Sequence, residues 1–206
     1  MVSKIDTAWD LFLEGKTSEA KKLVEQDFSI DTCTDFSLLN LMGYLLLAEK
    51  DYASCTHIFE KYILLAQQKE DKENEHIGLH QLAMIYRDQG DFHKALKLIE
   101  DEEKIVEEHF PNDNLKKAVN NYEQGYVRFK LNNLDEALTF MNLSLEQSLE
   151  TDDVISQACS YRGLGEIYFA LEDTEISNRH FKRALELFES AGEFEGVKEI
   201  EELINR

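Results

Sequence analysis

The chain has 206 residues, of which 43% are hydrophobic, and 22 basic against 42 acidic residues give it a net charge of −20. This composition can bury a core, while the negative charge disfavours nucleic acid and anionic lipid surfaces as direct ligands. Nine glycines and one proline are few for this length, which favours long helices with tight connections over a sandwich or barrel.

Helical periodicity of the apolar residues predicts that the helices come in consecutive pairs along the chain. The predicted pairs are 2–14 with 17–29, 35–49 with 52–69, 73–89 with 92–109, 114–131 with 134–150, and 154–171 with 174–191. A last helix is predicted over 194–205, where Val197, Ile200 and Ile204 form an apolar stripe that can cap the last pair. We therefore expect an all-α fold in a single domain over residues 1–206.

The five predicted pairs share one pattern when the sequence is compared with itself. Each first helix carries a small residue between larger apolar ones, and a turn and a second helix follow. A small residue lets two helices approach closely while the larger ones fill the neighbouring holes. The small positions are Ala8, Gly43, Ala83, Gly125 and Gly165, which are 35, 40, 42 and 40 residues apart.

This pattern resembles the tetratricopeptide repeat family over nearly the whole chain. The family period is about 34 residues, so the middle hairpins here are longer by roughly one to two helical turns. Longer periods of this kind are similar to the superhelical domains of bacterial peptide-pheromone receptors of the Rap and PlcR type, and to kinesin light chains. The resemblance implies a right-handed α-solenoid of about five hairpins plus the capping helix, in a bacterial, cytoplasmic protein that binds proteins or peptides.

The fourth repeat departs from the pattern because polar residues occupy slots that are apolar in the third. These residues are Asn121, Gln124 and Arg128. One interpretation is that the first helix of this repeat is rotated, so that Tyr122, Tyr126 and Phe129 point inward. The other is that the three polar side chains line a site.

A search for catalytic and metal-binding patterns gives only weak candidates. There is no GxSxG, P-loop or dinucleotide fingerprint. His76 and His80 are spaced i, i+4, but no carboxylate clearly completes a metal site. Six acidic residues between Glu100 and Glu108 predict a solvated face or, less simply, a docking patch for a basic partner. Three cysteines without CxxC spacing favour a reducing compartment, and no apolar run approaches the length that spans a bilayer.

The resemblance also implies a binding face, because the first helix of each pair lines the concave side of such solenoids. Aromatic residues are enriched at the corresponding positions, and they are suited to holding a peptide. The predicted peptide-binding residues are Asn40, Tyr44, His80, Met84, Arg87, Tyr122, Tyr126, Phe129, Arg162 and Phe169. Asn40 can pair with a peptide backbone, and the two arginines can select an acidic side chain or a terminal carboxylate. A clamp of lysines for a peptide carboxylate is missing, because Ile5, His80 and Tyr122 stand in its place.

The sequence therefore predicts a non-catalytic adaptor or sensor that binds a protein or peptide in an aromatic-lined groove. No catalytic residue, metal site or cofactor is expected, and neither nucleic acid nor membrane is an expected partner. The alternative is a structural or oligomerisation module that forms a homodimer through the same apolar face.

Overall fold

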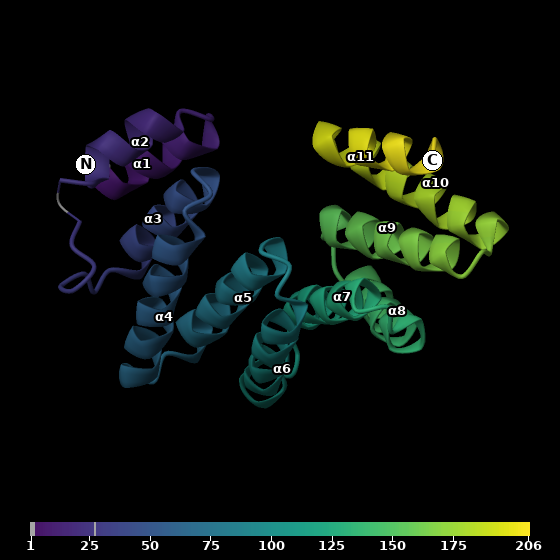
Figure 1. The fold of residues 1–206 in the computed structure, drawn as a ribbon, viewed down its shortest axis with the longest axis horizontal. Helices are drawn as coiled ribbons and strands as arrows, with labels where there is room; N and C mark the ends of the chain where they lie inside the picture. Colours follow the sequence, from purple (N-terminus) through teal and green to yellow (C-terminus); the bar gives the residue numbers. More distant parts are fainter. Residues whose placement is uncertain (1–2, 27) are drawn as a thin grey trace. The chain divides into compact units, whose positions relative to one another are not determined.

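The computed structural model describes residues 3–26 and 28–206, and this part of the chain forms eleven α-helices and no strand (Figure 1). The helices are α1 (Lys4–Leu13), α2 (Thr17–Val24), α3 (Phe36–Ala48), α4 (Tyr52–Gln68), α5 (Lys72–Asp88), α6 (Phe92–His109), α7 (Asn114–Lys130), α8 (Leu134–Leu149), α9 (Val154–Ala170), α10 (Thr174–Ala191) and α11 (Phe194–Ile204). The predicted all-α class and the five helical pairs with a final helix are confirmed.

Two details differ from the sequence prediction. Helix α2 ends at Val24, whereas the prediction extended it to residue 29; residue 27, like residues 1 and 2, lies outside the described part of the chain. In α11 the buried stripe runs through Ile200 and Leu203, while Ile204 is 45% exposed. Leu203 completes the stripe because it lies three residues after Ile200, on the face that packs against α10.

Contacts divide the described chain into two compact units, with the boundary inside α6 between Leu98 and Ile99. The first unit contains α1 to α5 and the beginning of α6, around one apolar core. The second contains the remainder of α6 and α7 to α11, with two apolar clusters. A single domain over residues 1–206 stays a prediction.

Glycines allow the two helices of a hairpin to cross closely. In three hairpins the small residue of the first helix lies under a large side chain that follows it by sixteen residues. A methyl group on the glycine would lie 2.5 Å from its neighbour at two of these sites and 3.1 Å at the third. The pairs are Gly43 with Phe59, Gly165 with Phe181, and Gly125 with Met141. Gly43 and Gly165 thus stand at helix crossings, as the repeat pattern predicts.

The turn inside each hairpin is built on a left-handed residue seven positions after the small one. These residues are Gly15, Lys50, Gly90, Asn132 and Glu172, with φ between +60° and +79°. The next residue often caps the second helix: the Asp51 carboxylate accepts from the Ser54 backbone N–H, and that of Asp173 accepts from Ile176.

Candidate functional site

The first helix of the fourth repeat, α7, is not rotated. Gly125 faces Met141 and Ala137 of α8, in the same way that Gly43 and Gly165 face the second helices of their own hairpins. With this register kept, Asn121, Gln124 and Arg128 occupy the buried slots despite their polarity. The predicted rotation of the helix is therefore wrong, although Tyr122 is buried and Tyr126 and Phe129 pack against the same apolar cluster.

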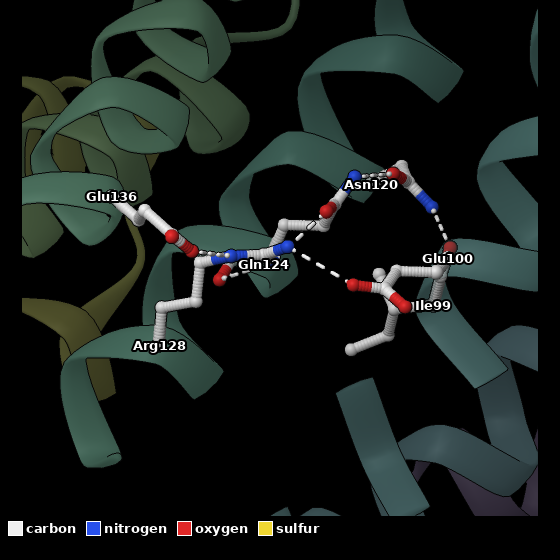
Figure 2. Close-up of polar contacts among 6 residues, drawn as sticks. All are labelled: Ile99, Glu100, Asn120, Gln124, Arg128 and Glu136. Carbon is white, nitrogen blue, oxygen red and sulfur yellow. Dashed lines mark hydrogen bonds and ion pairs between the residues drawn. The ribbon is translucent and has the colours of Figure 1, made fainter. Parts of the chain in front are cut away.

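The buried polar side chains of α7 satisfy one another and a neighbouring backbone. Figure 2 shows the Asn120 amide donating to the carbonyl of Ile99 on α6, at 3.0 Å. The Gln124 amide donates to Asn120 Oδ1 at 3.0 Å, and Arg128 Nη1 donates to Gln124 Oε1 at 2.9 Å. Pairing of this kind removes the desolvation cost of burying polar groups.

Arg128 ends the network with its charge neutralised on both sides (Figure 2). Its Nη2 lies 3.1 Å from Glu100 Oε1 on α6, and its Nε lies 3.0 Å from Glu136 Oε2 on α8. The guanidinium also lies over the ring of Phe140, 4.1 Å from its centroid. Because all these groups pair within the fold, the network explains the packing of α7 and offers no unpaired group to a ligand.

A small polar cavity of about 230 Å³ lies beside the network, between α6, α7 and α8. Two of its lining residues form an amide pair, in which Asn121 Nδ2 donates to Gln147 Oε1 at 2.7 Å. The other lining residues are Glu103, Val106, Glu107, Lys117 and Asn120. Two residues of the acidic stretch therefore face this cavity, while Glu102 of the same stretch is buried.

In the first unit the predicted binding residues lie on α3 and α5. Tyr44 forms an aromatic cluster with Trp9 and Phe12 of α1, with ring centroids 5.8 and 5.9 Å from those of its partners. Burial raises the pKa of the Tyr44 hydroxyl, although a hydrogen bond with Gln81 acts in the opposite direction. On α5, His80, Met84 and Arg87 are half-buried, and Arg87 Nη2 lies 3.4 Å from Asp88.

In the second unit the structure brings together most of the predicted binding residues. Tyr122 is buried and stacks on Tyr126, with ring centroids 6.2 Å apart and planes inclined by 19°. The ammonium of Lys130, on the next turn of α7, lies 4.9 Å from the Tyr126 ring and 5.2 Å from that of Phe129. Phe169 lies near the end of α9 and is 51% exposed. A cation over two rings gives this face a mixed aromatic and positive character.

Arg162 of α9 provides the charged centre of this cluster. Its Nη2 donates to the Tyr122 hydroxyl, and its Nη1 lies 2.5 Å from Glu199 Oε2 on α11. Burial opposes the charged form, but the nearby Tyr122, Cys159 and Glu199 raise the pKa of the guanidinium above its ordinary value. Glu199 was not among the residues predicted from the sequence, because it lies 37 residues away from Arg162 along the chain.

Two buried side-chain polar atoms lack a hydrogen-bond partner among the described residues. They are Oδ1 of Asn40 in the first unit and Nε of Arg162 in the second. Both belong to residues that the sequence predicts to line the binding face. Buried polar atoms without a partner are rare in folded proteins, so each of the two calls for an explanation.

Other chemistry has little support in the described residues. They contain no group of three His, Cys, Asp or Glu side chains that could hold a metal ion, and His76 Nε2 lies 3.7 Å from Glu73. Burial raises the pKa of Cys159, and it raises that of Cys55 to about 12, which disfavours the reactive thiolate. None of the described helices is both long and apolar enough to cross a bilayer.

Comparison with known proteins agrees with the repeat pattern. Two tetratricopeptide repeat models match the chain, one over residues 114–190 and the other over residues 79–101. These matches support the tetratricopeptide repeat family. Among curated proteins, none matches this sequence.

Solved structures share the fold at low sequence identity. The putative kinesin light chain TPR-like repeats of Podosopora anserina are 14% identical, with a TM-score of 0.69 over 92% of this chain and 95% of theirs. BtubC (BKLC) from P. vanneervenii is 18% identical, with a TM-score of 0.67 over 98% of this chain and 89% of its own. MamA from Desulfovibrio magneticus RS-1 is 18% identical, with a TM-score of 0.62 over 91% of this chain and 94% of its own. At this identity the likeness concerns the tetratricopeptide-like solenoid fold alone.

Proposed function

We propose that this chain is a non-catalytic protein- or peptide-binding adaptor or sensor, whose binding residues lie on the first helices of its hairpins. The tetratricopeptide fold is a scaffold for protein interaction, and the fold alone cannot assign a ligand. The observation that supports the proposal is the pair of unpartnered buried atoms, Asn40 Oδ1 and Arg162 Nε. One accepts and the other donates a hydrogen bond, and both are among the ten residues predicted from the sequence to bind a peptide.

Within each unit, the surroundings of the unpartnered atom suit an extended or helical peptide. Asn40 shares α3 with Tyr44, whose ring packs beside Trp9 and Phe12. Arg162 lies 5.7 Å from the ring centroid of Tyr122, which itself stacks on Tyr126. Rigid aromatic surface beside a few polar groups gives affinity at low entropic cost, and the polar groups fix the orientation of the ligand. The likeness to Rap and PlcR receptors stays a prediction.

Capture of a partner from the native lysate with the immobilised intact chain tests the proposal first. With that partner in hand, Tyr126→Ala and Arg162→Ala should each weaken binding by about 2 kcal/mol or more, as hot-spot truncations do. Arg183→Ala is the matched control, because Arg183 of α10 is exposed and pairs with a neighbouring exposed carboxylate, that of Glu186. Tyr126→Ala and Arg162→Ala are called the groove variants below. If both bind normally while Glu103→Gln or Glu107→Gln abolishes binding, the partner contacts the polar cavity between α6, α7 and α8, and the proposed binding face is wrong.

Asn40 allows a sharper test, because binding and stability should change in opposite directions. Asn40→Leu removes the unpartnered acceptor and fills the same space, so the free energy of unfolding should stay the same or rise. The affinity for the captured partner should nevertheless fall. Loss of stability without loss of binding would show that the amide serves only the fold.

The alternative function, a homodimer through the same apolar face, is tested with the same variants. Light scattering of the intact chain over a range of concentrations measures its mass in solution. A dimer that Tyr126→Ala dissociates would replace the peptide proposal, since the face would then be occupied by a second copy of the chain.

A further inference from the structure

The guanidinium of Arg162 contacts side chains from two other helices of the second unit. Tyr122 of α7 and Glu199 of α11 bind its two terminal nitrogens, and Arg162 itself projects from α9. The two ends of the ion pair differ in exposure. The Arg162 side chain is 17% exposed, whereas that of Glu199 is 51% exposed. The carboxylate therefore reaches in from the solvent side towards a buried cation.

The contact between Glu199 and Arg162 uses only part of what the guanidinium offers. The ion pair joins Oε2 of the carboxylate to Nη1, while Nη2 donates to the phenol of Tyr122 and Nε has no partner in the described structure. Guanidinium groups bind a carboxylate best when two parallel N–H groups reach its two oxygens. Because Nε is buried and Nη2 is engaged by Tyr122, Nη1 is the nitrogen that an incoming carboxylate can reach, once Glu199 has moved away from it.

Several other charges face this point. Burial raises the pKa of the nearby Glu166, although Arg162 and Lys130 lower it. Glu199 adds a further negative charge, and Arg206 a positive one. Glu123 of α7 and Cys159 of α9 also lie within electrostatic range of the Tyr122 and Arg162 pair. The site is thus a buried cation on which acidic side chains of the chain itself converge.

We propose that Glu199 is an internal competitor, whose carboxylate occupies Arg162 until the carboxylate of a ligand displaces it. This inference rests on the proposed function and names the ligand class at Arg162: a peptide that presents an Asp or Glu side chain or its terminal carboxylate. Helix α11 then sets the affinity of the site for acidic ligands.

Displacement needs only a side-chain rotation. Helix α11 is anchored by Ile200 and Leu203, which are buried, and by Gly196, which packs under the ring of Phe188. None of these contacts involves the Glu199 carboxylate. An ion pair with one exposed partner contributes little to stability and is readily exchanged, so the carboxylate can move into solvent while the helix stays in place.

The test uses the intact chain and N-acetyl-glutamate methylamide, a probe whose only charge is a glutamate carboxylate. Its dissociation constant is measured by nuclear magnetic resonance, from the shift of the Arg162 Nε–H signal during titration. In Glu199→Gln the probe should bind about two- to fivefold more tightly than in wild type, the range expected for removing an exposed ion pair. Glu199→Asp keeps the charge but shortens the side chain, and it should fall between the two.

Two controls separate local competition from other effects. Glu202→Gln makes the same charge change at an exposed position of the same helix, and it should leave the affinity unchanged. The double variant Arg162→Ala with Glu199→Gln should lose the site, which is then followed by the Tyr122 and Tyr126 ring signals.

Each remaining outcome overturns a specific statement. Equal affinity in wild type and Glu199→Gln, or an equal gain in Glu202→Gln, overturns the competition at Arg162. If the captured partner still requires Tyr126 and Arg162 in that case, the proposed function stands without this inference. If the partner binds every groove variant normally, the proposed function fails whatever the probe does.

Discussion

The ring of Phe181 lies directly over Gly165, so that a methyl group on the glycine would be 2.5 Å from two ring carbons. The ring belongs to the second helix of the last hairpin and the glycine to the first. The same relationship joins Phe59 to Gly43. A glycine is required at these points because only a missing Cβ leaves room for the aromatic ring.

Replacing Gly165 with Leu should therefore destabilise the fold by about 1–3 kcal/mol, the usual cost of overpacking a core. Urea unfolding followed by circular dichroism measures the change in the free energy of unfolding. Ala170→Leu is the matched control, because Ala170 is exposed on the same helix. A Gly165→Leu variant as stable as that control would show that the crossing tolerates a side chain.

The left-handed turns give a prediction of the opposite sign. Glu172 has a φ of +64°, a conformation that costs a residue with a Cβ about 1–2 kcal/mol relative to glycine. Glu172→Gly relieves this cost but loses more chain entropy on folding, so it should raise the free energy of unfolding by only about 0.5–1 kcal/mol. Gly90→Ala is the reverse substitution at the equivalent turn position and serves as the control. Gly90 has a φ of +79° and open space around it. Gly90→Ala should lower the free energy of unfolding. If this free energy stays the same in either variant, the backbone explanation is wrong.

The repeat pattern predicted most of the fold because a small residue and a turn recur in every hairpin, with the turn always seven positions after the small residue. Gly43 and Gly165 could be placed at crossings from the sequence alone, since each is the small residue between larger apolar ones in the first helix of its hairpin. The last residue of the buried stripe of α11 was misplaced by one position because Leu203 and Ile204 are both apolar, and helical periodicity alone does not decide between neighbours.

The candidate site was less predictable, for a physical reason. That Tyr122 and Tyr126 lie on one face follows from their spacing of four residues. The approach of Glu199 to Arg162 depends on how α11 packs across α9, and no local pattern encodes this. The polar slots of α7 were equally ambiguous, because whether Gln124 points inward depends on its partners, Asn120 and Arg128, rather than on its own polarity.

Glu166 gives a prediction on pH dependence. Burial raises its pKa above the ordinary value of 4.5, so the folded chain binds its proton more tightly than the unfolded chain does. The stabilisation that results is fully present below pH 4.5 and is lost as pH rises through the folded-state pKa. Glu166→Gln should therefore gain stability relative to wild type as pH rises above 4.5. Thermal unfolding between about pH 4 and about pH 8 measures the difference, with Glu202→Gln as an exposed control. A difference that does not vary with pH would contradict it.

The last prediction concerns the polar network of α7. It distinguishes the destabilisation caused by breaking the network from the net contribution of the network to the free energy of unfolding. Arg128→Ala removes the partner of Gln124 Oε1 inside the core and the packing over Phe140. It should cost about 1–3 kcal/mol, because a buried polar group is left without a hydrogen bond. The carboxylates of Glu100 and Glu136 are about half exposed and can be hydrated in this variant, which limits the loss of stability.

Replacing the whole set by the residues of the third repeat should behave differently. The triple variant Asn121→Leu, Gln124→Leu and Arg128→Tyr removes the polar groups together and restores an apolar slot pattern. Substituting a buried polar network by packed apolar side chains is often neutral or stabilising, so we expect unfolding free energies within about 1 kcal/mol of wild type or above it. Asn120 keeps its bond to the Ile99 carbonyl in this variant, but its buried Oδ1 loses the Gln124 donor, which offsets part of the gain. If the triple variant loses as much stability as Arg128→Ala, the packing of α7 requires the polar pairs themselves, and its divergence from the other repeats is a condition for folding.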